Sequence, residues 1–186
     1  SKLESKEFDD MTNENIFDQQ FWKEAWDNDP NTQDKRMKRA GLGQPEAPGF
    51  EKWAENFNKN SFTEESQKRV KRIMSWIQNQ TGGFENLSIL DVGAASGVFS
   101  IPFSKESAKV TSLEPSSILH DMLKDNAQHY GVEIETINES FENIETTDIK
   151  KFDLVFASMC PAVTTWDALE KAIDIAHQYV YVSLIA

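Results

Sequence analysis

The sequence is poor in cysteine and has no long apolar run. A single cysteine, Cys160, among 186 residues excludes a disulfide within the chain and is typical of a reducing compartment. No stretch approaches the ~20 apolar residues that a membrane helix requires, and the opening residues lack the basic and apolar segments of a signal peptide. His120 and His129 have no cysteine or acid at ligand spacing, so we expect no metal site. These absences predict a cytoplasmic protein without a membrane partner.

The charge is unevenly distributed. The net charge of −12 is carried by residues 1–30 and 81–186, whereas residues 31–80 contain more bases than acids. An acidic body repels phosphate backbones and argues against nucleic acid as a partner. The basic runs at residues 35–39 and 68–72 are the one region that could attract an anionic substrate. A solvated helix face is the alternative interpretation of both runs.

The most informative stretch is Ser88 to Ser104. Apolar residues lead into Asp91, and a turn of small residues, Gly93 to Gly97, follows before another apolar run. A strand, a small-residue turn and a helix form the nucleotide cradle of α/β domains, because the turn lets a ligand approach the main chain. About twenty residues later, a second predicted strand ends at Glu114, where such folds hold ribose hydroxyls.

The spacing of the glycines discriminates between cofactors. A dinucleotide fingerprint requires glycines at positions 93, 95 and 98, but Ala95 and Val98 occupy two of them. The pattern acid-x-Gly-x-Gly-x-Gly fits Asp91, Gly93 and Gly97, with Ala95 at the middle glycine. With Glu114, this pattern resembles the nucleotide-binding loop of class I S-adenosylmethionine-dependent methyltransferases. The resemblance covers roughly residues 50–186.

The resemblance implies a set of cofactor-binding residues. Asp91 would orient the loop and the methionine amino group, and Glu114 would hold both ribose hydroxyls. Ser140 and Phe141 would meet the adenine, with Glu139 as the rival of Ser140. The expected cofactor-binding residues are Asp91, Gly93, Ala94, Ala95, Ser96, Gly97, Glu114, Pro115, Ser140, Phe141 and Ser158.

The acceptor side is expected on two other segments. The loop Ser158-Met159-Cys160-Pro161 follows the fourth strand and would face the methyl group, but it lacks the Asn/Asp-Pro-Pro-aromatic motif of base and amide methylation. In cytosine-carbon methyltransferases the nucleophilic cysteine of this loop follows a proline, whereas Cys160 precedes Pro161. Cys160 is therefore interpreted as a thiol that lines the pocket and not as a nucleophile. In the resembling family an N-terminal helix forms a pocket wall, for which Trp53 and Phe57 are the candidates. No residue is assigned as catalytic, because alignment of the acceptor with an activated methyl supplies much of the rate.

Patterns along the chain predict the fold class. Helices are expected over residues 14–29, 50–57 and 116–130, with a capping box from Ser61 to Glu64 opening another that ends at Gly82-Gly83. Further strands are expected over 132–137, 152–157 and 179–185, and a helix over 164–177. Together with the resemblance, these elements imply a Rossmann-like three-layer α/β sandwich with parallel sheet order 3-2-1-4-5, in which the last strands of the family's seven-stranded fold are missing. A helical N-terminal segment (residues 1–60) would precede the S-adenosylmethionine-binding domain (residues 61–186).

The sequence therefore predicts methyl transfer from S-adenosylmethionine to a small-molecule acceptor. An RNA or protein methyltransferase that uses the basic runs is one alternative, and a non-catalytic module that binds the cofactor is another. An apolar edge strand at the end of the sheet would need a cover, either a homodimer partner or a missing C-terminal segment.

Overall fold

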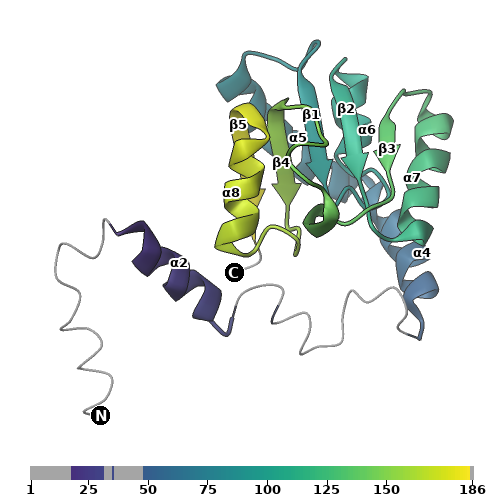
Figure 1. Cartoon of the computed structure of the whole chain (residues 1–186). Helices are drawn as coiled ribbons and strands as arrows, with labels where there is room; N and C mark the ends of the chain where they lie inside the picture. The colour runs from purple at the N-terminus through teal and green to yellow at the C-terminus, as the bar shows by residue number, and fades with distance from the viewer. Residues whose placement is uncertain (1–17, 32–34, 36–47, 185–186) are drawn as a thin grey trace.

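The computed structural model describes residues 18–31, 35 and 48–184 of the chain. Figure 1 shows a central sheet with helices on both faces. The strands are β1 (Ser88–Val92), β2 (Lys109–Leu113), β3 (Glu135–Ile137), β4 (Phe152–Ser158) and β5 (Ala176–Ser183). The helices are α2 (Gln19–Asn28), α4 (Phe50–Ser61), α5 (Glu64–Thr81), α6 (Ser100–Lys105), α7 (Ser117–Tyr130) and α8 (Trp166–Asp174), with a 3₁₀ turn at Phe141–Asn143.

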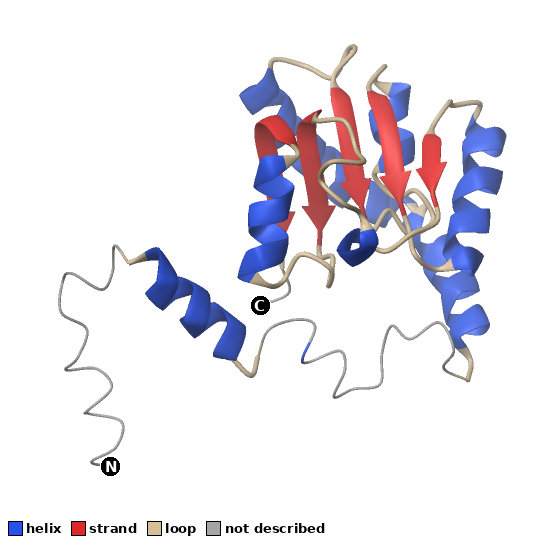
Figure 2. Ribbon diagram, viewed as in Figure 1, coloured by secondary structure: helices blue, strands red, loops and turns tan. Residues whose placement is uncertain are grey.

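The five strands form one parallel sheet in the order β3-β2-β1-β4-β5, which confirms the predicted fold and topology. Because all pairs are parallel, the strand arrows in Figure 2 point to the same edge. The strand order reverses between β1 and β4, since β2 and β3 lie on one side of β1 whereas β4 and β5 lie on the other, and open α/β sheets bind ligands at such a point.

Successive residues of the central strands point to opposite faces of the sheet and pack into two separate hydrophobic cores. Ile89 of β1 packs on one face with Val70 and Met74 of α5 and with Phe103 of α6. Leu90, the next residue, packs on the other face with residues of α8. Burial on both faces explains why these strands are nearly continuous apolar runs.

Local capping chemistry sets the start of α5, and here the sequence interpretation is wrong. The side chain of Thr63 caps the helix by accepting from the N–H of Ser66, whereas Ser61 ends α4 and donates its hydroxyl to the carbonyl of Phe57. Thr63 stands immediately before the helix in extended conformation, the position that an N-cap residue requires. At the other end, Gly82 adopts φ +81° and terminates α5 as expected.

The boundary between α8 and β5 also differs from the prediction. The predicted helix over residues 164–177 ends at Asp174, because Ala176 already pairs with Phe152 in the sheet. Within this helix Ile173 is 53% exposed, whereas Ile175, just beyond its end, is buried. Tertiary pairing overrides the helical period at this point.

The N-terminal helices contact the body of the molecule. The Trp26 indole of α2 donates to the carbonyl of Thr164, and Lys23 pairs with Asp167 of α8. The predicted helix over 14–29 is thus observed from Gln19 to Asn28. The first residues of this prediction, together with residues 1–13 and most of 31–49, lie outside the described residues. Within the described part of the chain, no helix is both long and apolar enough to cross a membrane.

Candidate cofactor and acceptor site

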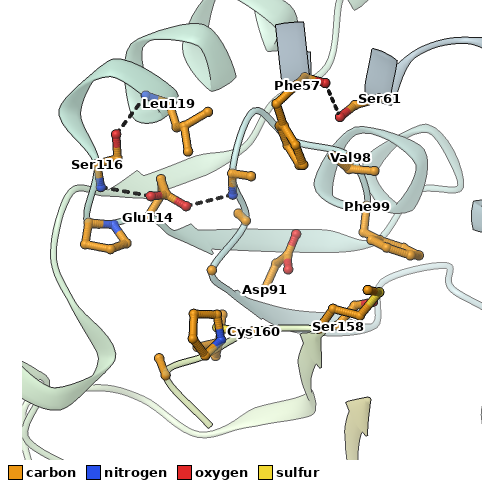
Figure 3. A pocket seen from close by; sticks show the side chains of 18 of the residues that line it. Phe57, Ser61, Asp91, Val98, Phe99, Glu114, Ser116, Leu119, Ser158 and Cys160 are labelled. Atoms are coloured by element: carbon orange, nitrogen blue, oxygen red, sulfur yellow. Dashed lines mark hydrogen bonds between the residues drawn. The ribbon is translucent and has the colours of Figure 1, made fainter. Parts of the chain in front are cut away.

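A cavity of about 700 Å³ opens at the edge of the sheet where the strands end. The loops after β1, β2 and β4 form its floor, the segment at Ser140 and Phe141 lies on one side, and α4 and α5 supply the wall on another. The cavity lies at the carboxyl ends of the parallel strands, where the reversal of strand order leaves a crevice. Figure 3 shows this cavity from close by.

The turn after β1 brings main-chain atoms to the cavity surface. Gly93 adopts φ +69°, and a Cβ placed there would lie only 2.5 Å from Sγ of Cys160. Ala95 also has a positive φ of +50°, a conformation uncommon for residues other than glycine. The turn is therefore shaped by its small residues, and the position of Gly93 accepts no side chain without displacement of its neighbour.

Glu114 follows β2 and is buried in this cavity, with 5% of its surface exposed. Each carboxylate oxygen accepts one backbone N–H at 2.8 Å, Oε2 from Ala95 and Oε1 from Ser116 (Figure 3). Burial raises the pKa of the carboxyl group, while these two hydrogen bonds oppose the increase. The remaining lone pairs of both oxygens are available to a ligand with two adjacent hydroxyl groups.

Asp91 lies beneath the turn, at the end of β1, and is 3% exposed. Its Oδ2 accepts a 2.5 Å hydrogen bond from the hydroxyl of Ser100, which is itself 2.7 Å from the hydroxyl of Ser112. Burial raises the pKa of Asp91 to about 7, the charge of Glu114 adds to the increase, and the Ser100 hydrogen bond opposes it. A cationic ligand group beside Asp91 would favour its ionised form.

Cys160 packs against the turn and is 5% exposed. Burial, with smaller contributions from the charges of Glu114 and Asp91, raises the pKa of its thiol to about 12. The thiolate is the nucleophilic form of cysteine, so this environment disfavours nucleophilic chemistry. The thiol contributes to the shape of the cavity.

Arg69 of α5 is the one cation among the described residues that line the cavity. Its guanidinium contacts Sδ of Met159 at 3.2 Å and lies 5.9 Å from the ring centre of Phe99. Met159 follows β4 in a left-handed conformation, with φ +51°. Nη1 of Arg69 donates to the Met159 sulfur, and the other N–H groups of the planar guanidinium are available for a ligand carboxylate.

The structure brings most of the predicted site residues together. Thirteen of the predicted residues line the cavity: Trp53, Phe57, Asp91, Gly93, Ala94, Ala95, Glu114, Pro115, Ser140, Phe141, Ser158, Met159 and Cys160. Ser96 and Gly97 do not line the cavity: Ser96 is fully buried, and a Cβ at Gly97 would meet Leu123 at 2.8 Å.

The segment predicted to meet the adenine has a defined local structure. Ser140 lines the cavity beside Phe141, whose carbonyl accepts a 2.6 Å hydrogen bond from Lys171. The rival residue, Glu139, accepts hydrogen bonds from the N–H of Ser140 and from the side chain of Asn143. Glu139 is outside the lining and supports the backbone of the segment.

Several lining residues were not identified from the sequence, chiefly Arg69 and the two amides Asn56 and Asn60. The basic run at 68–72 was a signal for Arg69, but it does not distinguish the cation that faces the cavity from its solvated neighbours. Among the described residues, no group of three or more histidine, cysteine or acidic side chains is placed to hold a metal ion.

Comparison with known proteins identifies the fold family. Residues 89–180, from β1 into β5, match the family model described as a methyltransferase domain. These residues carry a methyltransferase domain. The ubiquinone biosynthesis O-methyltransferase of Salmonella newport (strain SL254) is 27% identical to this domain over 82 residues, which are 44% of this chain and 34% of that protein. The chain thus spans about a third of the length of the curated relatives it matches.

Solved structures of other proteins have the same fold as this chain. A protein of Methanococcus maripaludis, assigned as an S-adenosyl-L-methionine-dependent methyltransferase, aligns with a TM-score of 0.63 and 20% identity over 76% of this chain and 67% of that one. The magnesium protoporphyrin IX methyltransferase of Synechocystis PCC 6803, solved with bound S-adenosylmethionine, aligns with a TM-score of 0.55 and 19% identity over 70% of this chain and 67% of that one.

Proposed function

We propose that this chain transfers a methyl group from S-adenosylmethionine to a small-molecule acceptor. The observation that carries the proposal is Glu114, a buried carboxylate inside the cavity whose two oxygens are fixed by main-chain N–H groups of the turn and of Ser116. This geometry suits the adjacent hydroxyls of a ribose, because each oxygen can accept one of them. The family match of residues 89–180 supports it.

The charged groups of the cavity correspond to those of the cofactor. Asp91 would hold the cofactor's ammonium group, Glu114 its ribose, and Arg69 its carboxylate. Ser140 and Phe141 would contact the adenine, and Pro115 would lie beside the ribose. At Gly93 the thiol of Cys160 fills the space that a Cβ would take, so the packing of Cys160 against the turn requires glycine there.

The cofactor supplies a methyl group already activated on a sulfonium, so the residues of the chain need only position the acceptor. Ser158, Met159 and Cys160 follow β4 and line the cavity beside the turn, where they would contact the acceptor. Trp53 and Phe57, from the N-terminal segment up to residue 60, would form the opposite wall. The thiol of Cys160 stays protonated near neutral pH and takes no part in bond formation.

A small molecule is favoured over RNA or protein as the acceptor. The curated relatives act in ubiquinone biosynthesis, and one structural neighbour methylates magnesium protoporphyrin IX. The basic run of α5 is also divided in the structure, since Lys68 pairs with Glu64 whereas Arg69 faces the cavity. A net charge of −12 further disfavours a phosphate backbone.

Isothermal titration tests the proposal with two ligands, S-adenosylhomocysteine and NAD. Because the turn lacks the dinucleotide spacing, we expect S-adenosylhomocysteine to bind with a Kd of about 100 μM or lower and NAD to bind at least tenfold more weakly. Failure of S-adenosylhomocysteine to bind would overturn the proposal. Binding without turnover of any acceptor would instead favour a cofactor-binding module.

A further inference from the structure

The face of α4 that lines the cavity alternates aromatic rings and amides. Phe50, Trp53 and Phe57 are spaced three and four residues apart and lie on one side of the helix. Asn56 and Asn60 share that side. This interleaving differs from an ordinary core face, in which the amides would be replaced by apolar side chains.

The three rings form a continuous aromatic wall. The ring centres of Phe50 and Trp53 are 5.3 Å apart, and those of Trp53 and Phe57 are 5.2 Å apart with planes tilted by only 25°. Trp53 is nevertheless 46% exposed, although it lines the cavity. A large indole surface left partly in water beside a cavity is suited to contact with a flat apolar ligand.

The wall across the cavity is apolar and adaptable. Met159 is 38% exposed there, and Pro161 and Ala162 of the same loop after β4 also line the cavity. A thioether fits irregular ligand shapes and makes favourable contacts with aromatic rings. A ligand between α4 and this wall would have a ring surface on one face and a methionine side chain on the other.

The charge available to an acceptor is small. Among the described lining residues, the charged ones are Arg69, Asp91 and Glu114, and the proposed function assigns each to the cofactor. A charged acceptor would then lie in an apolar space without a counter-ion, which is unfavourable. The side chains of Asn56 and Asn60 make no hydrogen bond within the described part of the chain, so both can donate to or accept from a neutral polar group.

We infer that the acceptor is a flat, uncharged aromatic molecule bearing a hydroxyl or carbonyl group, with its ring against Trp53 and Phe57 and its polar group on Asn56 or Asn60. This inference rests on the proposed function, because it presumes that the cofactor occupies the three charged residues. It makes Trp53 and Phe57 residues that determine specificity, together with the two amides.

The cofactor's own adenine is the other flat ring that could use this wall. The proposed adenine segment is at Ser140 and Phe141, and Figure 3 shows Phe57 on the side of the cavity that holds Val98 and Phe99, with Glu114 on the opposite side. The aromatic wall of α4 thus lies on the side of the cavity away from Glu114, the residue proposed to hold the ribose. Saturation with S-adenosylhomocysteine fills the adenine position and separates the two uses.

The test compares four probes of similar size by isothermal titration of the full chain with saturating S-adenosylhomocysteine. The probes are 2-naphthol, the non-planar decahydro-2-naphthol, the anion 2-naphthoate and the cation 2-naphthylmethylammonium. We expect 2-naphthol to bind at least tenfold more tightly than each of the others. In Trp53→Leu this preference falls to within threefold, and it persists in Trp76→Leu, which alters an exposed tryptophan of α5 outside the cavity. Asn56→Ala together with Asn60→Ala lowers the affinity for 2-naphthol but not for naphthalene, a fifth probe that lacks the hydroxyl group, and Gln78→Ala changes neither.

Several results would overturn the inference. These are equal binding of planar and non-planar probes, preference for a charged probe, no binding of any probe, or a preference unchanged in Trp53→Leu. A large loss of S-adenosylhomocysteine affinity in Trp53→Leu would assign the wall to adenine and also reject it. If wild-type chain fails to bind S-adenosylhomocysteine, the proposed function fails, and the same four probes on the unliganded chain still decide whether the cavity selects flat, neutral rings.

Discussion

The backbone N–H of Ala95 donates a 2.8 Å hydrogen bond to Oε2 of Glu114 and so connects the turn after β1 to the end of β2. Ala95 makes this contact at φ +50°, where glycine is favoured over other residues. Since the donor is the main chain, the contact does not depend on the alanine methyl group. The turn and the carboxylate are thus held in position relative to each other without a ligand.

Substitutions at Ala95 should separate backbone strain from contact. We expect Ala95→Gly to keep the free energy of unfolding within about 1 kcal/mol of wild type, because relief at positive φ offsets the lost methyl packing. Ala95→Val places a β-branched residue in the left-handed region and should cost about 1–3 kcal/mol. Urea denaturation measures both. Equal stability of the valine and glycine variants would show that the turn relaxes and carries no strain.

Removal of the cavity cation should weaken cofactor binding. In Arg69→Met the guanidinium is lost while an apolar side chain remains to contact Met159 and Phe99. We expect S-adenosylhomocysteine to bind about tenfold or more weakly, from the loss of a charge-assisted hydrogen bond worth roughly 1.5–3 kcal/mol. Arg72→Met, which changes an exposed cation on the same helix, is the matched control. Equal affinities of the two variants for S-adenosylhomocysteine would show that Arg69 does not bind the cofactor.

Asp91 should make the stability of the free protein depend on pH. Its pKa is near 3.8 in the unfolded chain and about 7 when folded, so its stabilising contribution is complete below the unfolded value and is lost as pH rises toward 7. Asp91→Asn should therefore melt at a higher temperature than wild type above pH 7, with a difference that grows between about pH 4 and 7 and then levels off. Differential scanning fluorimetry across this range checks it. A constant difference at all pH values would contradict a raised pKa.

The same titration should appear in binding. A ligand ammonium favours ionised Asp91, so the affinity of wild type for S-adenosylhomocysteine should fall as pH drops below 7, approaching a limit of about tenfold per pH unit. In Asp91→Asn the affinity should be low and independent of pH between 6 and 8. A wild-type affinity that is flat across this range would show that Asp91 does not contact a cation.

Gly93 and Cys160 should behave as a coupled pair. Because a Cβ at Gly93 would lie 2.5 Å from Sγ of Cys160, Gly93→Ala should lower both stability and cofactor affinity. The double variant with Cys160→Ala should recover part of the stability, and Cys160→Ala alone should keep cofactor affinity within about threefold of wild type. A double-mutant cycle by urea denaturation measures the coupling. Strict additivity would place the two residues out of contact.

The strands and the cradle turn could be predicted because short local patterns determine them, and the sheet order followed from the resemblance to class I methyltransferases that the turn carries. Apolar strands buried on both faces and the small residues from Gly93 to Gly97 are visible without tertiary information. The cavity cation could not be predicted, since the run at 68–72 repeats cations and only the packing of α5 directs Arg69 inward. The end of α8 was missed for a similar reason: the pairing of Ala176 with Phe152 interrupts a pattern that reads as helix.

The pocket face of α4 shows the same limit. Its aromatic residues predict a wall at Trp53 and Phe57, because rings at helical spacing share a side. The exposed amides between them resemble solvated helix positions in sequence. Their approach to the cavity depends on how α4 crosses α7, which no local pattern determines.

The most direct measurement is the affinity of Glu114→Gln for S-adenosylhomocysteine, compared with Glu139→Gln. An amide nitrogen at residue 114 would face the N–H of Ala95 or Ser116, so the variant loses an acceptor and gains a repulsive contact. Glu139 also accepts a backbone N–H but lies outside the cavity lining. The account predicts affinity at least about tenfold weaker for Glu114→Gln and within threefold of wild type for Glu139→Gln. Unchanged binding in Glu114→Gln, or an equal loss in both variants, would contradict it.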